Sequence, residues 1–305
     1  MTKNFRLVLA LHFLAACLWV PGWAGAADAI AVLAPERQGA SGEFTQSLVA
    51  ALGRVAAGVQ VRVVSSAGDA SSSDIRLVIA VGSSAQQAIA AQPARPQVLA
   101  TLAPRATYER LFDKAGRTTA LYLDQPKERQ LGLLTLLPSA PKSVGVVFSS
   151  GSSLPIASLR AAAGRLGLRL VEVPVTPERD VAAAVQEAAS QAEFLLAHPD
   201  PGVFGPQTIQ NILLTTYRAR VPMLGFSPAY TRAGALLSLH SSPAQLAEQA
   251  ADMAKQTLQS GSLPAPQYPR DYEVSVNRQV ARSLGIDLPA EGALVERLRQ
   301  KERSQ

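Results

Sequence analysis

Short polar loops follow several apolar runs of this 305-residue chain, and their side chains could bind a small molecule. Ser83 and Ser84 begin a predicted helix directly after the apolar run 75–81. The free N–H groups and the dipole at a helix start favour an anion such as a carboxylate. We therefore expect both serines to contact a ligand, although they could equally serve only to cap the helix.

A second group of polar side chains follows the later apolar runs. Ser149, Ser150 and Ser153 lie in one loop after the run 144–148, and their hydroxyls could hydrogen-bond a ligand. Ser153 could equally cap the next helix. Asp200 follows another buried run, and its carboxylate could accept a ligand hydroxyl or ammonium or simply form a turn between two prolines. We expect ligand contacts from these four residues.

Two aromatic residues complete the predicted binding set. Phe226 and Tyr230 follow the predicted strand 222–226, and their rings could stack on a ligand ring. Phe226 could equally end that strand inside the core. His198 is expected to pack or to form a turn, and Arg105 could pair with an anionic ligand or remain a solvated charge.

The chain lacks the residue sets that catalysis requires. It contains no nucleophile elbow, no Walker loop, no dinucleotide fingerprint and no paired acid with a histidine base. The loop 149–153 contains glycine but not the lysine of a phosphate-cradling loop. Besides His12, the only histidines are His198 and His240, and neither has metal-ligand spacing around it. We expect no enzymatic activity, no cofactor and no metal.

Composition and charge narrow the class of protein further. Hydrophobic residues make up 48% of the chain and charged residues 17%, which is enough apolar material for sizeable cores. The net charge of +6 is spread along the chain without a lysine or arginine block. Nucleic-acid binding needs clustered cations, so we do not expect a nucleic-acid partner.

The N-terminus has the three parts of a secretory signal. Lys3 and Arg6 precede the apolar run 7–20, and small residues follow at Ala24 and Ala26. The apolar run is too short to span a membrane comfortably. The sequence therefore predicts cleavage between Ala26 and Ala27 and export to the periplasm.

A lipoprotein signal is the alternative way to process this N-terminus. The run 14–17 resembles a lipobox in which Cys17 would be lipidated. The apolar run continues past Cys17, however, which favours release as a soluble protein. Cys17 is the only cysteine, so a chain beginning at Ala27 would have no disulfide and no cysteine ligand for a metal.

Strands and helices are predicted to alternate along the chain, and this order must position the polar loops. Strands are expected at 30–33, 61–64, 75–81, 98–101, 119–123, 144–148, 169–173, 194–197, 222–226 and 272–276. Helices are expected at 43–57, 85–91, 126–137, 156–166 and 208–219, with a long helix that begins at Ser242 and ends at Gly261. Two successive βα series indicate two parallel-sheet domains, whose ligands bind at the carboxyl ends of the strands.

Several of these segments resemble one known family. The runs 127–138, 142–148, 232–236 with 249–254, and 281–289 are similar to the ABC-transporter substrate-binding proteins of the tryptophan/tyrosine-type group. The resemblance extends from Thr119 to Pro289, and Val81–Ala85 fits the family's binding loop in the first lobe.

The resemblance implies an α/β fold with two Rossmann-like parallel-sheet lobes joined by a hinge, the type I periplasmic binding protein. The first lobe would comprise residues 27–122 and about 240–272, and the second 123–239 and about 273–305. The implied partners are a small-molecule ligand and an ABC permease with its ATPase at the inner membrane. The protein itself would be a monomer.

The chain departs from the family in two loops. Members carry acidic residues after the last strand of the second lobe, whereas the loop 226–230 has none. Arg105 lies where members have an acidic turn. A ligand ammonium needs a buried carboxylate, and Asp200 is the one acid in these loops. We expect a solute-binding protein of an importer. The alternatives are a sensor or accessory protein of the same fold, with a specialised or lost site, and an exported α/β enzyme.

Overall fold

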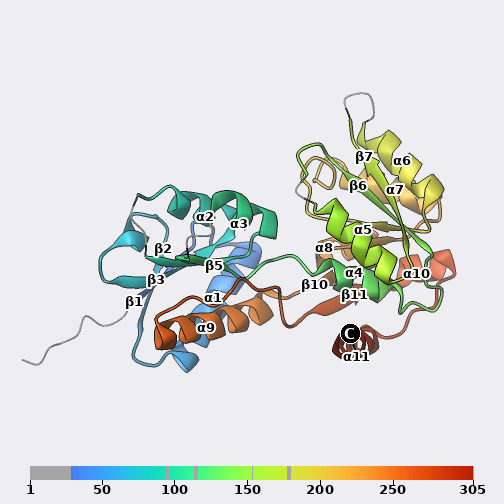
Figure 1. Ribbon diagram of the computed structural model, residues 1–305. Helices are drawn as coiled ribbons and strands as arrows, with labels where there is room; N and C mark the ends of the chain where they lie inside the picture. Colours follow the sequence, from blue (N-terminus) through green and yellow to red (C-terminus); the bar gives the residue numbers. More distant parts are fainter. Residues whose placement is uncertain (1–28, 94–95, 113–115, 153, 177–179, 305) are drawn as a thin grey trace, which may run out of the picture.

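The computed structural model describes residues 29–93, 96–112, 116–152, 154–176 and 180–304. The predicted export signal with its cleavage position at Ala26 and Ala27, the alternative lipidation site Cys17 and the predicted contact Ser153 lie outside the described residues. The described chain forms two lobes, each built on a mostly parallel sheet with helices on both faces (Figure 1). This arrangement confirms the predicted fold class.

The first lobe contains a five-stranded parallel sheet in the order β2-β1-β3-β4-β5. Its strands are β1 (Ala29–Leu33), β2 (Gln60–Val64), β3 (Ile75–Val81), β4 (Gln97–Thr101) and β5 (Thr118–Ala120). Its helices are α1 (Gly39–Val55), η1 (Asp69–Ser71), α2 (Gly82–Ala90) and α3 (Arg105–Leu111). The central strand β3 is buried at every residue except Arg76, as expected for a parallel strand covered on both faces.

Two helices from distant parts of the sequence cover one face of this sheet. Phe44, Leu48 and Leu52 recur at helical spacing in α1 and are fully buried against α9 (Pro243–Ser260) and the sheet. The helix α9 begins with a capping box between Ser242 and Gln245, and it ends at Gly261 in the left-handed conformation. The predicted limits of this long helix are therefore confirmed.

The second lobe contains a six-stranded sheet in the order β11-β10-β9-β8-β6-β7, in which only β11 is antiparallel among the described strands. The strands are β6 (Ser143–Phe148), β7 (Arg169–Pro174), β8 (Phe194–Leu196), β9 (Met223–Gly225), β10 (Leu237–His240) and β11 (Glu273–Val276). The helices are α4 (Lys127–Leu134), α5 (Ile156–Arg165), α6 (Val181–Gln191), α7 (Ile209–Arg218), α8 (Pro228–Ala233), α10 (Arg278–Leu284) and α11 (Glu291–Arg303).

Two predicted elements extend well beyond the observed ones at their C-terminal ends. The helix predicted at 126–137 spans Lys127–Leu134, because Pro126 is its N-cap and the chain turns before Pro138, where helical backbone is disfavoured. The strand predicted at 119–123 spans Thr118–Ala120, since the following residues leave the sheet toward the second lobe.

The chain crosses between the lobes three times, after β5, after β10 and after α9. The first and third crossings run side by side, because Tyr122 donates its N–H to the Gln267 carbonyl at 2.9 Å. Gln125 on the first crossing donates to Ser241 on the second at 2.8 Å, and Ser241 donates to the Asp271 carbonyl on the third at 2.6 Å. Hydrogen bonds therefore connect all three segments of the hinge.

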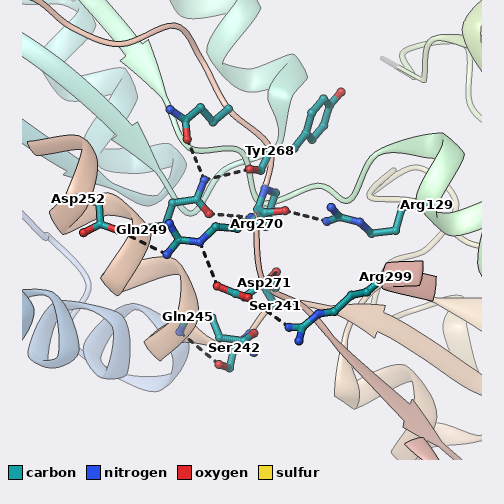
Figure 2. A network of polar contacts seen from close by, with 12 residues as sticks. Arg129, Ser241, Ser242, Gln245, Gln249, Asp252, Tyr268, Arg270, Asp271 and Arg299 are labelled. Atoms are coloured by element: carbon teal, nitrogen blue, oxygen red, sulfur yellow. Dashed lines mark hydrogen bonds and ion pairs between the residues drawn. The ribbon is translucent and has the colours of Figure 1, made fainter. Parts of the chain in front are cut away.

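Further polar contacts anchor the hinge to helices on both sides (Figure 2). Arg129 of α4 donates to the Gln125 side chain at 2.8 Å and to the Pro269 carbonyl at 2.7 Å. Gln249 of α9 donates to the Tyr268 carbonyl at 3.1 Å and accepts the Arg270 N–H at 2.8 Å. Each lobe thus holds the third crossing through a side chain of its own.

Candidate ligand-binding cleft

An opening lies between the two lobes beside the first and third crossings. Its empty space is about 540 Å³, including the part that is open to solvent. It is lined by Pro104, Arg105, Ala106, Glu109, Asp124, Lys127, Leu154, Pro155, His198, Pro199 and Tyr268. Apart from Tyr268 on the third crossing, these residues follow strands β4, β5, β6 and β8 in the chain, so the opening lies at the carboxyl ends of parallel strands. This is where open α/β sheets bind ligands.

The first-lobe wall of the cleft is organised around Arg105, the first residue of α3. Its Nε donates to Glu109 Oε1 at 2.7 Å, and one terminal nitrogen donates to the Tyr268 hydroxyl at 3.1 Å. Its backbone N–H donates to Asp124 Oδ2 at 2.5 Å. The hydrogen bonds to Tyr268 and Glu109 raise the pKa of Arg105 further above its ordinary value. Arg105 is therefore a charged group that already has a carboxylate partner.

Aromatic rings pack around Arg105 on this wall. The Tyr122 and Tyr268 rings meet edge to face with their centroids 5.1 Å apart, and the Arg105 guanidinium lies 5.8 Å from the Tyr122 centroid. Tyr108 also packs edge to face on Tyr122, at 6.0 Å. Burial raises the pKa of Tyr122 to about 12. Tyr122 and Tyr268, which come from segments distant in sequence, therefore both hold Arg105 in position.

Lys127 lies at the hinge end of the cleft, as the first residue of α4. Its side chain is half-buried, and its ammonium donates to Gln130 Oε1 at 3.2 Å. Burial lowers the pKa of Lys127, an effect that the charges of Asp124 and Glu128 oppose. Among the described residues the ammonium forms no ion pair.

His198 of the second lobe faces the same opening but is itself buried, with 2% of its surface exposed. Its Nε2 lies 3.2 Å from the Val147 carbonyl, and its ring meets Phe204 edge to face at 5.7 Å. Burial first, and then the charge of Lys127, lower the pKa of His198 to about 4, against the attraction of Asp200. The ring is therefore neutral at pH 7, and Nε2 carries the proton because a carbonyl only accepts.

Asp200 and Ser149 come together, although not on the surface of the cleft. Asp200 Oδ2 accepts the Ser149 N–H at 2.8 Å, and Oδ1 accepts the Ser149 hydroxyl at 2.9 Å and the Gly202 N–H at 3.0 Å. Burial disfavours the charge of Asp200, but the hydrogen bonds from Ser149 and Gly202 help to keep its pKa below the ordinary value. Both oxygens are thus used to join the loops after β6 and β8.

The other predicted ligand contacts lie elsewhere in the two lobes. Ser83 and Ser84 are in the first turn of α2, where Ser84 donates to Glu36 Oε1 at 2.9 Å. Ser150 is exposed. Phe226 and Tyr230 pack on one another with centroids 4.4 Å apart and against the second-lobe core. None of them lines the opening described above, and their ligand roles stay predictions.

Tyr230 has a clear structural role. Its hydroxyl donates to the Phe204 carbonyl at 2.8 Å, and burial raises its pKa to about 12. It also packs tightly over β9, because a Cβ added at Gly225 would lie 2.5 Å from the Tyr230 Cβ.

Several residues of the cleft carried no signal in the sequence. Asp124 and Lys127 lie in one segment and Leu154 and Tyr268 in two others, and no spacing relates these three segments. Arg105 and His198 were visible only as charged or titratable residues in loops after predicted strands. Within the described ranges, no group of three or more His, Cys, Asp or Glu side chains could hold a metal ion. In that same part of the chain, no helix has the length and apolar character needed to cross a membrane.

Solved structures with the same architecture include substrate-binding proteins. A conserved domain protein of Vibrio cholerae is 20% identical, with a TM-score of 0.60 over 89% of this chain and 98% of its own. A substrate-binding protein with adhesive properties from Clostridium difficile, in its ligand-free open form, is 16% identical, with a TM-score of 0.68 over 86% and 95%. A Streptococcus pneumoniae ABC domain in complex with L-Trp is 16% identical, with a TM-score of 0.61 over 86% and 96%.

No protein of curated function matches the sequence significantly. The model of one family does match, over residues 50–297, which is most of the chain. That span includes most of both lobes, all three crossings and every residue that lines the cleft. The chain belongs to the ABC transporter substrate binding protein family.

Proposed function

We propose that this protein is the periplasmic binding component of an ABC importer, which captures a small molecule between its lobes and presents it to a permease and its ATPase. The observation that carries the proposal is the opening between the lobes, which lies at the carboxyl ends of strands and has walls from both lobes. A ligand bound there contacts both walls, and it therefore favours the state in which they approach one another.

The hinge supports such a movement. Three chain segments connect the lobes, and hydrogen bonds among Gln125, Ser241 and the Asp271 carbonyl keep those segments together. Rotation about this region moves each lobe as a body, since the sheets and their helices are separately packed. A ligand shifts the population toward closure only by the difference between its affinities for the two states. A permease that recognises the closed form would then distinguish the ligand-bound protein from the empty one.

The chemistry of the cleft supports binding rather than turnover. Of its two titratable second-lobe candidates, His198 is neutral, buried and hydrogen-bonded, and Asp200 is occupied by Ser149 and Gly202. A catalytic base must be within reach of a substrate proton. Asp200 does not line the opening, and His198, which does, has only 2% of its surface exposed. We therefore propose that the ligand leaves the cleft unchanged.

Thermal unfolding of the chain beginning at Ala27, against a broad library of nutrients, tests the proposal. A ligand that binds only the folded protein raises the melting temperature with its concentration. Ala106→Trp, placed on the cleft wall, is expected to abolish each shift, whereas Ala161→Trp on the exposed side of α5 keeps it. Uptake of the identified compound by cells with and without the protein then tests delivery. A folded protein that no compound stabilises would contradict the proposal.

A further inference from the structure

We propose that the ligand carries a carboxylate, which pairs with the ammonium of Lys127, and an apolar remainder that packs on Leu154, Pro155 and Pro199. This inference rests on the proposed function, because it assigns the chemical class of the molecule held in the same cleft. It follows from the charges that line the two walls and from the partners those charges already have.

Two cations and two carboxylates line the cleft, and only one of the four lacks a charged or backbone partner. Glu109 neutralises Arg105, which also donates to Tyr268. Asp124 accepts the backbone N–H of Arg105. Lys127 has only the neutral amide oxygen of Gln130 as a hydrogen-bond partner among the described residues. An ammonium has three N–H donors, so two remain for a ligand.

Closure of the lobes would not supply a free carboxylate to Lys127. Its helix α4 belongs to the second lobe, and the other acids of the cleft, Glu109 and Asp124, already accept hydrogen bonds from Arg105. The second-lobe residues beside Lys127 in the cleft are Leu154, Pro155, His198 and Pro199, none of which is acidic. The nearby acid, Asp200, uses both oxygens on Ser149 and Gly202. An ammonium that loses water without gaining an opposite charge is costly, and removal of water by closure increases that cost. An anionic ligand removes the cost, whereas a cationic one increases it.

The second-lobe wall determines the rest of the ligand. Leu154 and Pro199 are half-buried and Pro155 is exposed, so all three present apolar surface to the opening. Burial of that surface against an apolar group is favourable. Lys127 and this apolar surface together therefore select a molecule with one charged end and one apolar body.

The test compares carboxylates with their primary amides, which have nearly the same shape and no charge. The probes are hexanoate, 3-phenylpropanoate and indole-3-acetate beside hexanamide, 3-phenylpropanamide and indole-3-acetamide, with glucose, putrescine and inorganic phosphate as other classes. We expect thermal shifts from at least one carboxylate and none from its amide, followed by calorimetry for the Kd. Because this comparison uses the unaltered protein, it does not depend on a variant that folds.

Substitutions of Lys127 then test whether its ammonium is the group that binds the carboxylate. Lys127→Met should raise the Kd for the carboxylate at least about tenfold, and Lys127→Arg should recover part of the loss. Lys255→Met, on the exposed side of α9, is the matched control and should bind as the unaltered protein does. Equal binding of acid and amide, or unchanged affinity in Lys127→Met, would overturn the inference. Stabilisation only by glucose, putrescine or phosphate would also overturn it and leave the proposed function standing. If no compound in a broad library stabilises the folded protein, both the carboxylate inference and the proposed function are contradicted.

Discussion

The Asp200 carboxylate accepts two hydrogen bonds from one residue, Ser149, from its N–H at 2.8 Å and from its hydroxyl at 2.9 Å. The two residues lie 51 positions apart, at the ends of β6 and β8, which are neighbours in the sheet. Sequence analysis predicts that both contact a ligand, and those contacts stay predictions; the structure shows that the two residues are bonded to each other. The pair fixes the loop that places His198 and Pro199 on the cleft wall.

Replacement of Asp200 is therefore expected to destabilise the second lobe. Asp200→Ala removes the acceptor from the part-buried hydrogen bonds of the Ser149 and Gly202 N–H groups, which should lower the free energy of unfolding by about 1–3 kcal/mol. Ser149→Ala removes only the hydroxyl and should cost about 1 kcal/mol. Urea unfolding measures both, with the exposed Ser150→Ala as a near-neutral control. If Asp200→Ala is as stable as the control, the carboxylate has no structural role.

Stability should depend on pH through His198. Its folded pKa of about 4 lies below the ordinary 6.5, so the unfolded chain binds the proton more tightly. The free energy of unfolding should then fall as pH drops from about 6.5 to 4, by about 3 kcal/mol in all, and no further from this group below that.

The variant His198→Gln isolates this contribution, because it keeps a donor for the Val147 carbonyl without the titration. Urea unfolding from pH 7 to pH 4 should show a weaker pH dependence in the variant than in the unaltered protein. His240→Gln controls for the other histidine, whose pKa is also lowered by burial. Parallel pH profiles for the His198 variant and the unaltered protein would show that this ring is not held neutral.

The ion pair between Arg129 and Glu302 should couple the C-terminal helix to the hinge. Arg129 Nε donates to Glu302 at 2.5 Å, and its guanidinium lies 4.2 Å from the Tyr272 centroid. Arg129 is 11% exposed, so a double-mutant cycle of Arg129→Met and Glu302→Gln should give a coupling energy of about 1–3 kcal/mol. The pair Arg303 and Glu296, exposed on the same helix, should give less than about 0.5 kcal/mol.

Hydrogen exchange provides an independent readout of that coupling. In Arg129→Met, the amides of α11 should exchange faster than those of α6, because the described hydrogen-bond partners of Arg129 are Glu302, Gln125 and Pro269 and none of them lies in α6. A coupling energy near zero, with unchanged exchange in α11, would mean that the helix docks through its buried Leu294 and Leu298 alone.

Gly225 should tolerate no side chain. A Cβ there would lie 2.5 Å from the Tyr230 Cβ and 2.6 Å from the Ser238 Oγ, so Gly225→Ala should lower the free energy of unfolding by about 2 kcal/mol or more. Gly164→Ala lies in α5 with no atom near its added Cβ and should instead raise it by about 0.5–1 kcal/mol. Thermal or urea unfolding of both variants checks the opposite signs, and equal effects would contradict the packing of Tyr230 over β9.

The fold could be predicted largely because its signals are local. The apolar run that forms β3 and the Ser242 and Gly261 limits of α9 need only the neighbouring residues to be recognised. The cleft is different, since Arg105 meets Tyr268 across 163 positions. A serine or aspartate after a strand can face a ligand or a neighbouring loop, and the sequence does not distinguish these uses. Asp200 contacts the neighbouring loop in the structure. That Lys127 forms no ion pair among the described residues becomes visible only when its contacts are known.

Lobe closure on a bound ligand tests the central proposal most directly. Spin labels on Arg110→Cys in α3 and Ala161→Cys in α5 would report the separation across the cleft in a chain that begins at Ala27 and so lacks Cys17. With a saturating compound from the thermal screen, the distance distribution should become shorter and narrower, and Ala106→Trp should prevent the change. A compound that stabilises the protein while the distances stay the same would contradict capture between the lobes.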